Sequence, residues 1–163
     1  MKDLVPPANW HIDLDLPSIA DSEQFAQQLA PCLDAPLVMT LSGDIGTGKT
    51  TIVRALLRTM GVRCRIKSPT FSLIETYDLP TAQFHHFDLY RIVDESELEF
   101  LGFRDYFQAN TLCCLEWPEK IQLPDDRVDL ALNIKHSGEG RMLKMVVRGR
   151  MQDVIQKKFR SHS

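Results

Sequence analysis

One segment of the sequence has the residue types and the spacing that suit chemistry on phosphate groups. Residues 43–50 read Gly-Asp-Ile-Gly-Thr-Gly-Lys-Thr, which matches the pattern of a phosphate-binding loop. Glycines let the backbone turn its N–H groups toward a phosphate, the lysine can reach the β and γ phosphates, and the threonine hydroxyl can ligate Mg²⁺. We therefore expect a nucleotide site formed by Gly43, Asp44, Ile45, Gly46, Thr47, Gly48, Lys49, Thr50 and Thr51.

Two acidic residues are candidates for the carboxylate that such a loop needs opposite it to hold the metal ion. Glu116 ends the apolar run 112–115, which is typical of a buried central strand, whereas Asp88 ends the run 84–87. The type of run favours Glu116 as the metal acid, beside Thr50. Asp88 is then expected on a loop near the γ phosphate, where it would orient water or sense the nucleotide. The alternative for either carboxylate is an ordinary surface acid at the end of a strand.

The sequence also bears on the base of the nucleotide. Guanine-specific sites usually carry Asn-Lys-x-Asp, and the nearest segment, 133–136, lacks both the spacing and the acid. We therefore expect ATP rather than GTP, with Mg²⁺ as its metal ion. His85 and His86 are adjacent, so they would face opposite sides of a strand, and a structural role is the prediction for each. Trp117 could stack on a base or a partner, although core packing explains it equally well.

The elements around the loop have the order that a phosphate-binding site requires. An apolar strand precedes the loop at 37–41, and a helical stripe follows it as far as Met60, with Gly61 as the stop. Alternation and turn signals predict further strands at 10–16, 71–77, 83–88, 111–115, 128–134 and 142–147. Capping and stop signals predict further helices beginning at Asp21 or Ser22, and at 94–102 and 152–159. The prediction is an α/β, P-loop NTPase-like three-layer fold, whose mixed sheet has a parallel centre and an antiparallel edge hairpin.

Length, composition and charge narrow the class of protein. The 163 residues suit one domain over 1–163, and 44% hydrophobic and 25% charged residues are ordinary for a globular protein. The longest apolar runs are too short to span a bilayer, and we see no secretory signal, so a cytoplasmic location is expected. Residues 141–163 carry seven Lys/Arg and one acid. This basic tail, centred on about 150–163, is either a solvated, frayed helix or a contact for RNA phosphates or an acidic partner.

Taken together, the motifs resemble one family, the small bacterial ATPases of tRNA threonylcarbamoyladenosine biosynthesis known as TsaE or YjeE. The resemblance is dense from residue 37 to residue 123. Its specific part lies downstream of the loop, in the motifs Lys-Ser-Pro-Thr-Phe at 67–71, His-Phe-Asp-Leu-Tyr-Arg at 86–91, Leu-Glu-Phe-Leu-Gly-Phe at 98–103 and Leu-Glu-Trp-Pro-Glu-Lys at 115–120. Ile45 and Thr47 depart from the commoner Leu and Ala, which matters little because the backbone makes the phosphate contacts.

The resemblance implies an ATPase that works with a TsaB–TsaD pair and resets that pair between turnovers, without carrying out the transfer to tRNA itself. It implies catalytic roles for Lys49, Asp88 and Glu116, with Thr50 and Glu116 on the metal ion. Segments 18–21 and 137–141 are guesses for the adenine contacts, and Arg91 or a residue of the partner could be an arginine finger. A small-molecule kinase and a nucleotide-gated binding module remain the alternatives.

Overall fold

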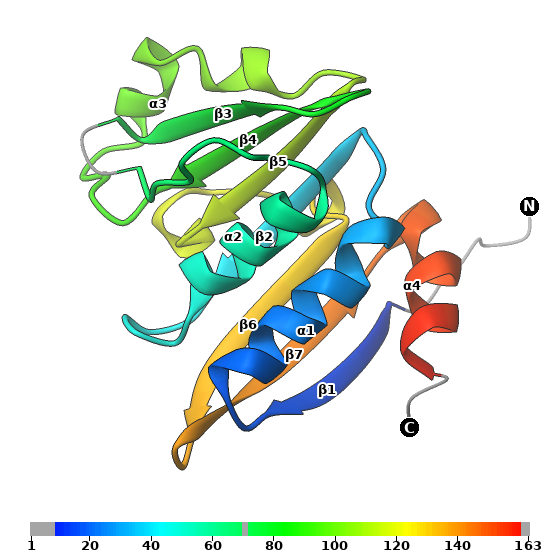
Figure 1. Cartoon of the computed structure of the whole chain (residues 1–163). Coiled ribbons are helices and arrows are strands. Elements are labelled where there is room, and N and C mark those ends of the chain that lie inside the picture. The colour runs from blue at the N-terminus through cyan, green and yellow to red at the C-terminus, as the bar shows by residue number, and fades with distance from the viewer. Residues whose placement is uncertain (1–8, 70–71, 161–163) are drawn as a thin grey trace, which may run out of the picture.

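The computed structural model of the chain describes residues 9–69 and 72–160. It contains seven strands and four α-helices within those ranges (Figure 1). In chain order the elements are β1 Trp10–Leu16, α1 Ile19–Leu29, β2 Leu37–Ser42, α2 Lys49–Thr59, β3 Ile74–Asp78, β4 Gln83–Asp88, α3 Ser96–Phe100, β5 Thr111–Glu116, β6 Leu130–Ser137, β7 Gly140–Val147 and α4 Gln152–Arg160. Short 3₁₀ turns occupy several of the connections.

The strands form one mixed sheet in the order β1-β7-β6-β2-β5-β4-β3. The central strands β6, β2, β5 and β4 run parallel, as predicted. The β6–β7 hairpin is also present, and β1 continues the antiparallel pairing on that side. A second antiparallel pair, β3 on β4, closes the other edge. The sheet is therefore antiparallel at both edges, and its parallel centre brings the ends of β2, β4 and β5 to one side.

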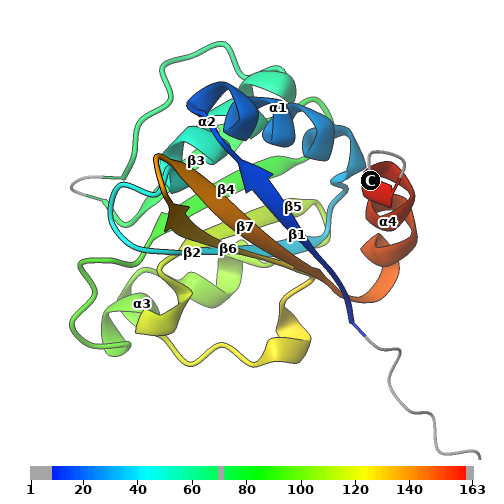
Figure 2. The same ribbon diagram turned by 90° about the horizontal axis from the view of Figure 1, so that it is seen from below.

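Helices cover both faces of this sheet, which gives three layers (Figure 2). Helices α1 and α2 pack on one face, and α3 lies on the other. The alternation of β5 shows why both faces are apolar, because Cys114 belongs to the core under α1 and α2 whereas Cys113 belongs to the core under α3. The four cysteines are free thiols, and three of them are buried.

Two local predictions need correction. Helix α1 begins at Ile19, and its N-cap is Ser18, not Asp21 or Ser22. The Ser18 side chain accepts a hydrogen bond from the Asp21 N–H, while the Asp21 carboxylate accepts one from the Ser18 N–H, so that Asp21 is the third residue of a capping box. Strand β3 begins at Ile74, not at residue 71, and residue 71 of the predicted strand lies outside the described residues.

The basic C-terminal helix is packed rather than frayed. Met151, Ile155 and Phe159 are buried in the core of the α1 and α2 face, and the Phe159 ring lies 5.6 Å from that of Phe25. Lys157 and Lys158 lie on the exposed side of the same helix. Contact with RNA stays a prediction. Within the described ranges, none of the helices combines the length and the apolar character needed to cross a bilayer.

Candidate functional site

The phosphate-binding loop connects β2 to α2, as predicted. All three of its glycines have positive φ: 147° at Gly43, 80° at Gly46 and 94° at Gly48. The need for glycine is strictest at Gly43, where an added Cβ would lie 2.4 Å from the carbonyl oxygen of Ile134 on the neighbouring strand β6. The loop is thus pressed against the sheet, and the N-terminus of α2 opens directly from it at Lys49.

Lys49 lies at the mouth of the loop and is 6% exposed. Its Nζ atom donates to the carbonyl oxygens of Gly43 at 2.6 Å and Asp44 at 3.0 Å, and it lies 4.4 Å from the centre of the Trp117 ring. Burial lowers the pKa of Lys49, and nearby carboxylates, Glu116 foremost, oppose that shift. The ammonium group is therefore held among acceptors at the position where a phosphate-binding lysine is needed.

Thr50, near the start of α2, meets Glu116, which ends β5, the parallel neighbour of β2. The Thr50 hydroxyl lies 3.4 Å from Glu116 Oε1 and 3.1 Å from the Ser68 hydroxyl, and Glu116 is 3% exposed. A hydroxyl beside a carboxylate suits Mg²⁺, which takes oxygen ligands and keeps much of its shell for phosphate and water. Within residues 9–69 and 72–160, there is no group of three or more His, Cys, Asp or Glu side chains that could hold a metal ion. The Thr50–Glu116 pair fits a cation that takes its other ligands from phosphate and water.

His86 contacts the candidate metal acid, which residue spacing alone did not reveal. Its Nε2 atom lies 2.9 Å from Glu116 Oε1, and both side chains are buried. Among the described residues the Nδ1 atom of His86 has no hydrogen-bond partner. His85 faces the other side of the sheet, as predicted, where it meets the Thr76 hydroxyl at 2.8 Å and packs against Tyr106. The predicted structural role fits His85, whereas His86 lies against Glu116 and can fix the orientation of its carboxylate.

Asp88 is the last residue of β4 rather than a loop residue, and it is paired in register with Glu116 on β5. Its Oδ1 atom accepts the Tyr90 N–H at 3.1 Å. Burial raises the pKa of Asp88, and the Tyr90 amide acts against that shift. Because side chains alternate along a strand, Asp88 and His86 share the face on which α2 lies. The two predicted acids thus end neighbouring strands on the side of the phosphate-binding loop.

A cleft of about 450 Å³ joins these groups. It is bounded by the loop, Asp88 and Glu116, and also by side chains that no local motif marks: Ile19 and Ser22 of α1, Tyr90, Trp117, and Arg141 of β7. Arg141 Nε donates to the Thr47 carbonyl oxygen at 2.9 Å. Segments 18–21 and 137–141, the guessed adenine contacts, therefore each place one residue on the cleft, and their contact with adenine stays a prediction.

Trp117 has an uncommon backbone conformation beside this cleft. Its φ of 59° is the one positive value among the described non-glycine residues, and such strain is often found at functional sites. The Trp117 ring lies 4.9 Å from that of Tyr90, and Lys49 and Lys120 approach the two rings of this pair. Trp117 therefore lines the cleft, and it also packs, partly buried, against the core that contains Phe87.

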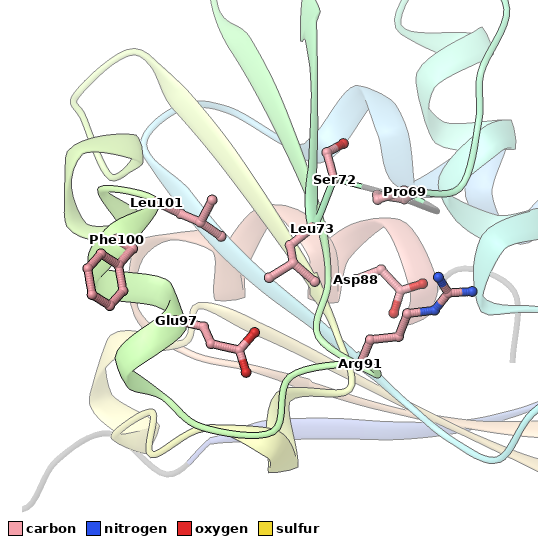
Figure 3. Close-up of a pocket in the computed structure, with 8 residues that line it drawn as sticks. All are labelled: Pro69, Ser72, Leu73, Asp88, Arg91, Glu97, Phe100 and Leu101. Carbon is pink, nitrogen blue, oxygen red and sulfur yellow. The ribbon is translucent and has the colours of Figure 1, made fainter.

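A second cleft, of about 480 Å³, lies on the other side of Asp88 (Figure 3). Its lining residues are Pro69, Ser72, Leu73, Asp88, Arg91, Glu97, Phe100 and Leu101. Asp88 is the residue common to the linings of both clefts. In Figure 3 the Arg91 side chain extends beside the Asp88 carboxylate, which places this candidate arginine next to the predicted switch acid.

Comparisons with known proteins show the family of this chain. The family described as threonylcarbamoyl adenosine biosynthesis protein TsaE matches residues 16–143. A TsaE of Haemophilus influenzae is 40% identical over 110 residues, 68% of this chain and 70% of that protein. A TsaE of Aquifex aeolicus is 32% identical over 128 residues, 77% of this chain and 88% of that protein.

The fold is also found in a solved structure, that of YdiB from Bacillus subtilis. It superposes with a TM-score of 0.72 at 23% identity and covers 94% of this chain and 97% of that one. This likeness confirms the predicted P-loop NTPase-like fold. On the family match and the two relatives, the chain belongs to the TsaE family of tRNA threonylcarbamoyladenosine biosynthesis.

Proposed function

We propose that the chain binds Mg·ATP in the cleft above its phosphate-binding loop and hydrolyses it in the service of tRNA threonylcarbamoyladenosine biosynthesis. One observation carries this proposal: the Thr50 hydroxyl and the Glu116 carboxylate lie 3.4 Å apart at the start of the helix that follows the loop. A hydroxyl and a carboxylate in that relation are what P-loop enzymes use to hold nucleotide-bound Mg²⁺.

Each residue has a distinct part in this account. Mg²⁺ supplies charge neutralisation between the phosphates when bound. The loop amides and Lys49 bind the phosphate oxygens, which requires the Lys49 ammonium to exchange its present carbonyl partners for phosphate. Thr50 and Glu116 hold the cation, and His86 keeps the Glu116 carboxylate oriented through its 2.9 Å contact. Asp88, at the far wall of the cleft, orients the attacking water or responds to the γ phosphate.

We propose further that activity is weak in the isolated chain and rises with a TsaB–TsaD pair, which the hydrolysis resets between turnovers. Support comes from the position of Asp88, which lines the nucleotide cleft on one side and an open cleft on the other. A protein bound at the second cleft would therefore contact the same strand end that faces the nucleotide. P-loop enzymes with an incomplete set of charges are commonly completed by a partner in this way.

The test is steady-state ATP hydrolysis by the chain alone and with the TsaB–TsaD pair. The Glu116→Gln variant should lose about 10²–10³-fold in rate under both conditions, because an ionised metal ligand is replaced by a neutral amide. Glu23→Gln, on the exposed side of α1, is the matched control and should keep the wild-type rate. Equal rates for wild type and Glu116→Gln, or no effect of the pair, would contradict the proposal.

The same assay separates the two alternatives. ADP and free phosphate released in equal amounts support hydrolysis, whereas ADP formed without matching phosphate would mean transfer to an acceptor, as in a small-molecule kinase. A nucleotide-gated binding module makes a different prediction. A Lys49→Ala chain that no longer hydrolyses ATP would still support tRNA modification with the TsaB–TsaD pair, and our account predicts that it does not.

A further inference from the structure

Two large apolar side chains are almost fully exposed near α3: Val93, three residues before the helix, and Phe100, its last residue. Val93 is 93% exposed and Phe100 is 91% exposed, and no other large apolar side chain in the described ranges reaches 70%. Leu101, next to Phe100, is 42% exposed. Single apolar side chains on a surface need no explanation, but several gathered around a cleft mark an interaction site.

This exposure is built into the fold and does not come from a loose segment. Leu98, in the middle of α3, is buried in the core that contains Phe87. Glu97 Oε1 accepts the Val93 N–H at 3.1 Å and the Asp94 N–H at 3.2 Å, which fixes the turn that leads into α3. Because α3 is anchored on its inner side, Phe100 is held out toward solvent on the other.

Between α3 and the end of β4 lies the second cleft described above. Figure 3 shows the Leu73 and Leu101 side chains and the Glu97 carboxylate directed toward a common space, with Asp88 and Arg91 together on the other side of it. The cleft thus has apolar walls, with the Glu97 carboxylate at one end and Asp88 beside Arg91 at the other. It could take one apolar side chain of a partner, and a neighbouring basic side chain of that partner would meet Glu97.

The negative charge around α3 indicates what kind of partner could bind there. Asp94, Glu95, Glu97 and Glu99 place four carboxylates within six residues, and all four lie on the exposed surface. Such a surface repels nucleic acid and attracts lysine and arginine side chains. In protein interfaces an apolar centre with a charged rim is the usual arrangement.

We propose that Val93, Phe100 and the cleft that reaches Asp88, together called the α3 surface, form the docking site for a protein segment that presents an apolar side chain flanked by Lys or Arg. The inference rests on the proposed function in taking the TsaB–TsaD pair as the protein that supplies this segment. Its occupant would touch Asp88, and through it the wall of the nucleotide cleft.

The test measures direct binding of the chain to the immobilised TsaB–TsaD pair in the presence of ATP and Mg²⁺. Two variants are compared with wild type: the double variant Val93→Ser/Phe100→Ser in the α3 surface, and Glu99→Lys among the acidic residues of α3 beside it. The matched controls lie near the opposite edge of the sheet, on β1 and α4. They are Val154→Ser, 51% exposed on α4, and Asp15→Lys, exposed on β1.

We expect the Kd to rise at least tenfold for the double variant and at least fivefold for Glu99→Lys, with both controls unchanged. ATP hydrolysis by each variant alone should equal that of wild type, because none of these residues lines the nucleotide cleft. Unchanged Kd values for both α3 variants, or no binding by wild type, would overturn the inference. A shift of the chain itself from dimer to monomer in the double variant would mean that a second copy occupies the surface, which also overturns it.

The hydrolysis assay keeps this result separate from the proposed function. Binding that depends on the α3 surface, but without faster hydrolysis, would contradict partner stimulation and leave the docking site standing. Faster hydrolysis with the TsaB–TsaD pair, together with unchanged binding of the α3 variants, would support partner stimulation and contradict the docking site.

Discussion

The two clefts that share Asp88 differ in whether the side chains around them already have partners within the chain. In the proposed nucleotide cleft, the functional groups are buried and already paired within the chain: Lys49 with loop carbonyls, and Glu116 with His86 and Thr50. In the α3 surface, Val93 and Phe100 have no cover from the described chain. Buried, paired groups indicate a site whose shape is set before its ligand arrives, whereas exposed apolar groups indicate one that is completed from outside. Asp88 connects these two kinds of surface.

The largest expected effect is a loss of ATP hydrolysis, and it should separate the two lysines beside the Tyr90–Trp117 pair. Lys49→Met should lower ATP hydrolysis about 10²–10³-fold, because the phosphate charge loses its buried cation. Lys120→Met, which removes the exposed lysine 5.6 Å from the Tyr90 ring, should change it less than about threefold. Steady-state kinetics at saturating ATP and Mg²⁺ measure both. Similar losses in the two variants would show that closeness to the rings, and not the loop, sets the effect.

Helix α3 allows the comparison to be made within a single turn. Leu98→Ala should lower the free energy of unfolding by about 2–5 kcal/mol, because it leaves a cavity in the core with Phe87. Phe100→Ala should stay within about 0.5 kcal/mol of wild type, since its ring is exposed. Urea denaturation followed by circular dichroism gives both values. A loss above about 1.5 kcal/mol in Phe100→Ala would mean that this ring is packed within the chain.

Two glycines with positive φ sharpen the claim that the loop is pressed against the sheet. Gly43→Ala should cost more than about 2 kcal/mol and weaken ATP binding, because its new Cβ would meet the Ile134 carbonyl oxygen. Gly61→Ala should cost about 1 kcal/mol, since only its φ of 100° opposes a side chain and no atom lies within 4 Å of the added Cβ. Thermal unfolding and ATP titration compare them. Equal costs would contradict the close approach of loop and strand.

The smallest effect concerns the acid shared by the two clefts. Burial raises the pKa of Asp88 in the folded protein, so ionised Asp88 opposes folding at neutral pH. That opposition is present above the raised pKa and disappears as the pH falls to about 4, where the carboxyl of the unfolded chain also takes up its proton. Asp88→Asn should therefore raise the unfolding temperature of the nucleotide-free protein at pH 7, by less at lower pH. The exposed Asp126→Asn is the control, and a lower unfolding temperature for Asp88→Asn at pH 7 would contradict this account.

Features encoded within a few residues were predictable from the sequence. The loop at 43–50, the strand before it and the helix after it all follow from local spacing, and so does the buried strand that ends at Glu116. The cap of α1 is also encoded locally, in the Ser18–Asp21 pair, although the sequence pattern predicts Asp21 or Ser22 as the cap.

Contacts made by strand pairing were not predictable in this way. His86 meets Glu116, 30 residues away, because β4 and β5 are neighbours, and Arg141 reaches Thr47 from a hairpin 94 residues away. The α3 surface could not be predicted from the sequence for a different reason. An apolar residue such as Phe100 looks like core material in a sequence, and only the packing of Leu98 shows which side of the helix faces solvent.

The claim that Thr50 and Glu116 hold the magnesium ion of ATP is tested most directly by isothermal titration calorimetry. ATP is titrated into wild type and Thr50→Val, each with Mg²⁺ and with EDTA, and Thr59→Val on the exposed end of α2 is the control. We predict that Mg²⁺ tightens ATP binding at least tenfold in wild type and Thr59→Val, and by less than twofold in Thr50→Val. The account is contradicted if ATP binds wild type equally well with Mg²⁺ and with EDTA, or if Thr50→Val keeps the full response to Mg²⁺.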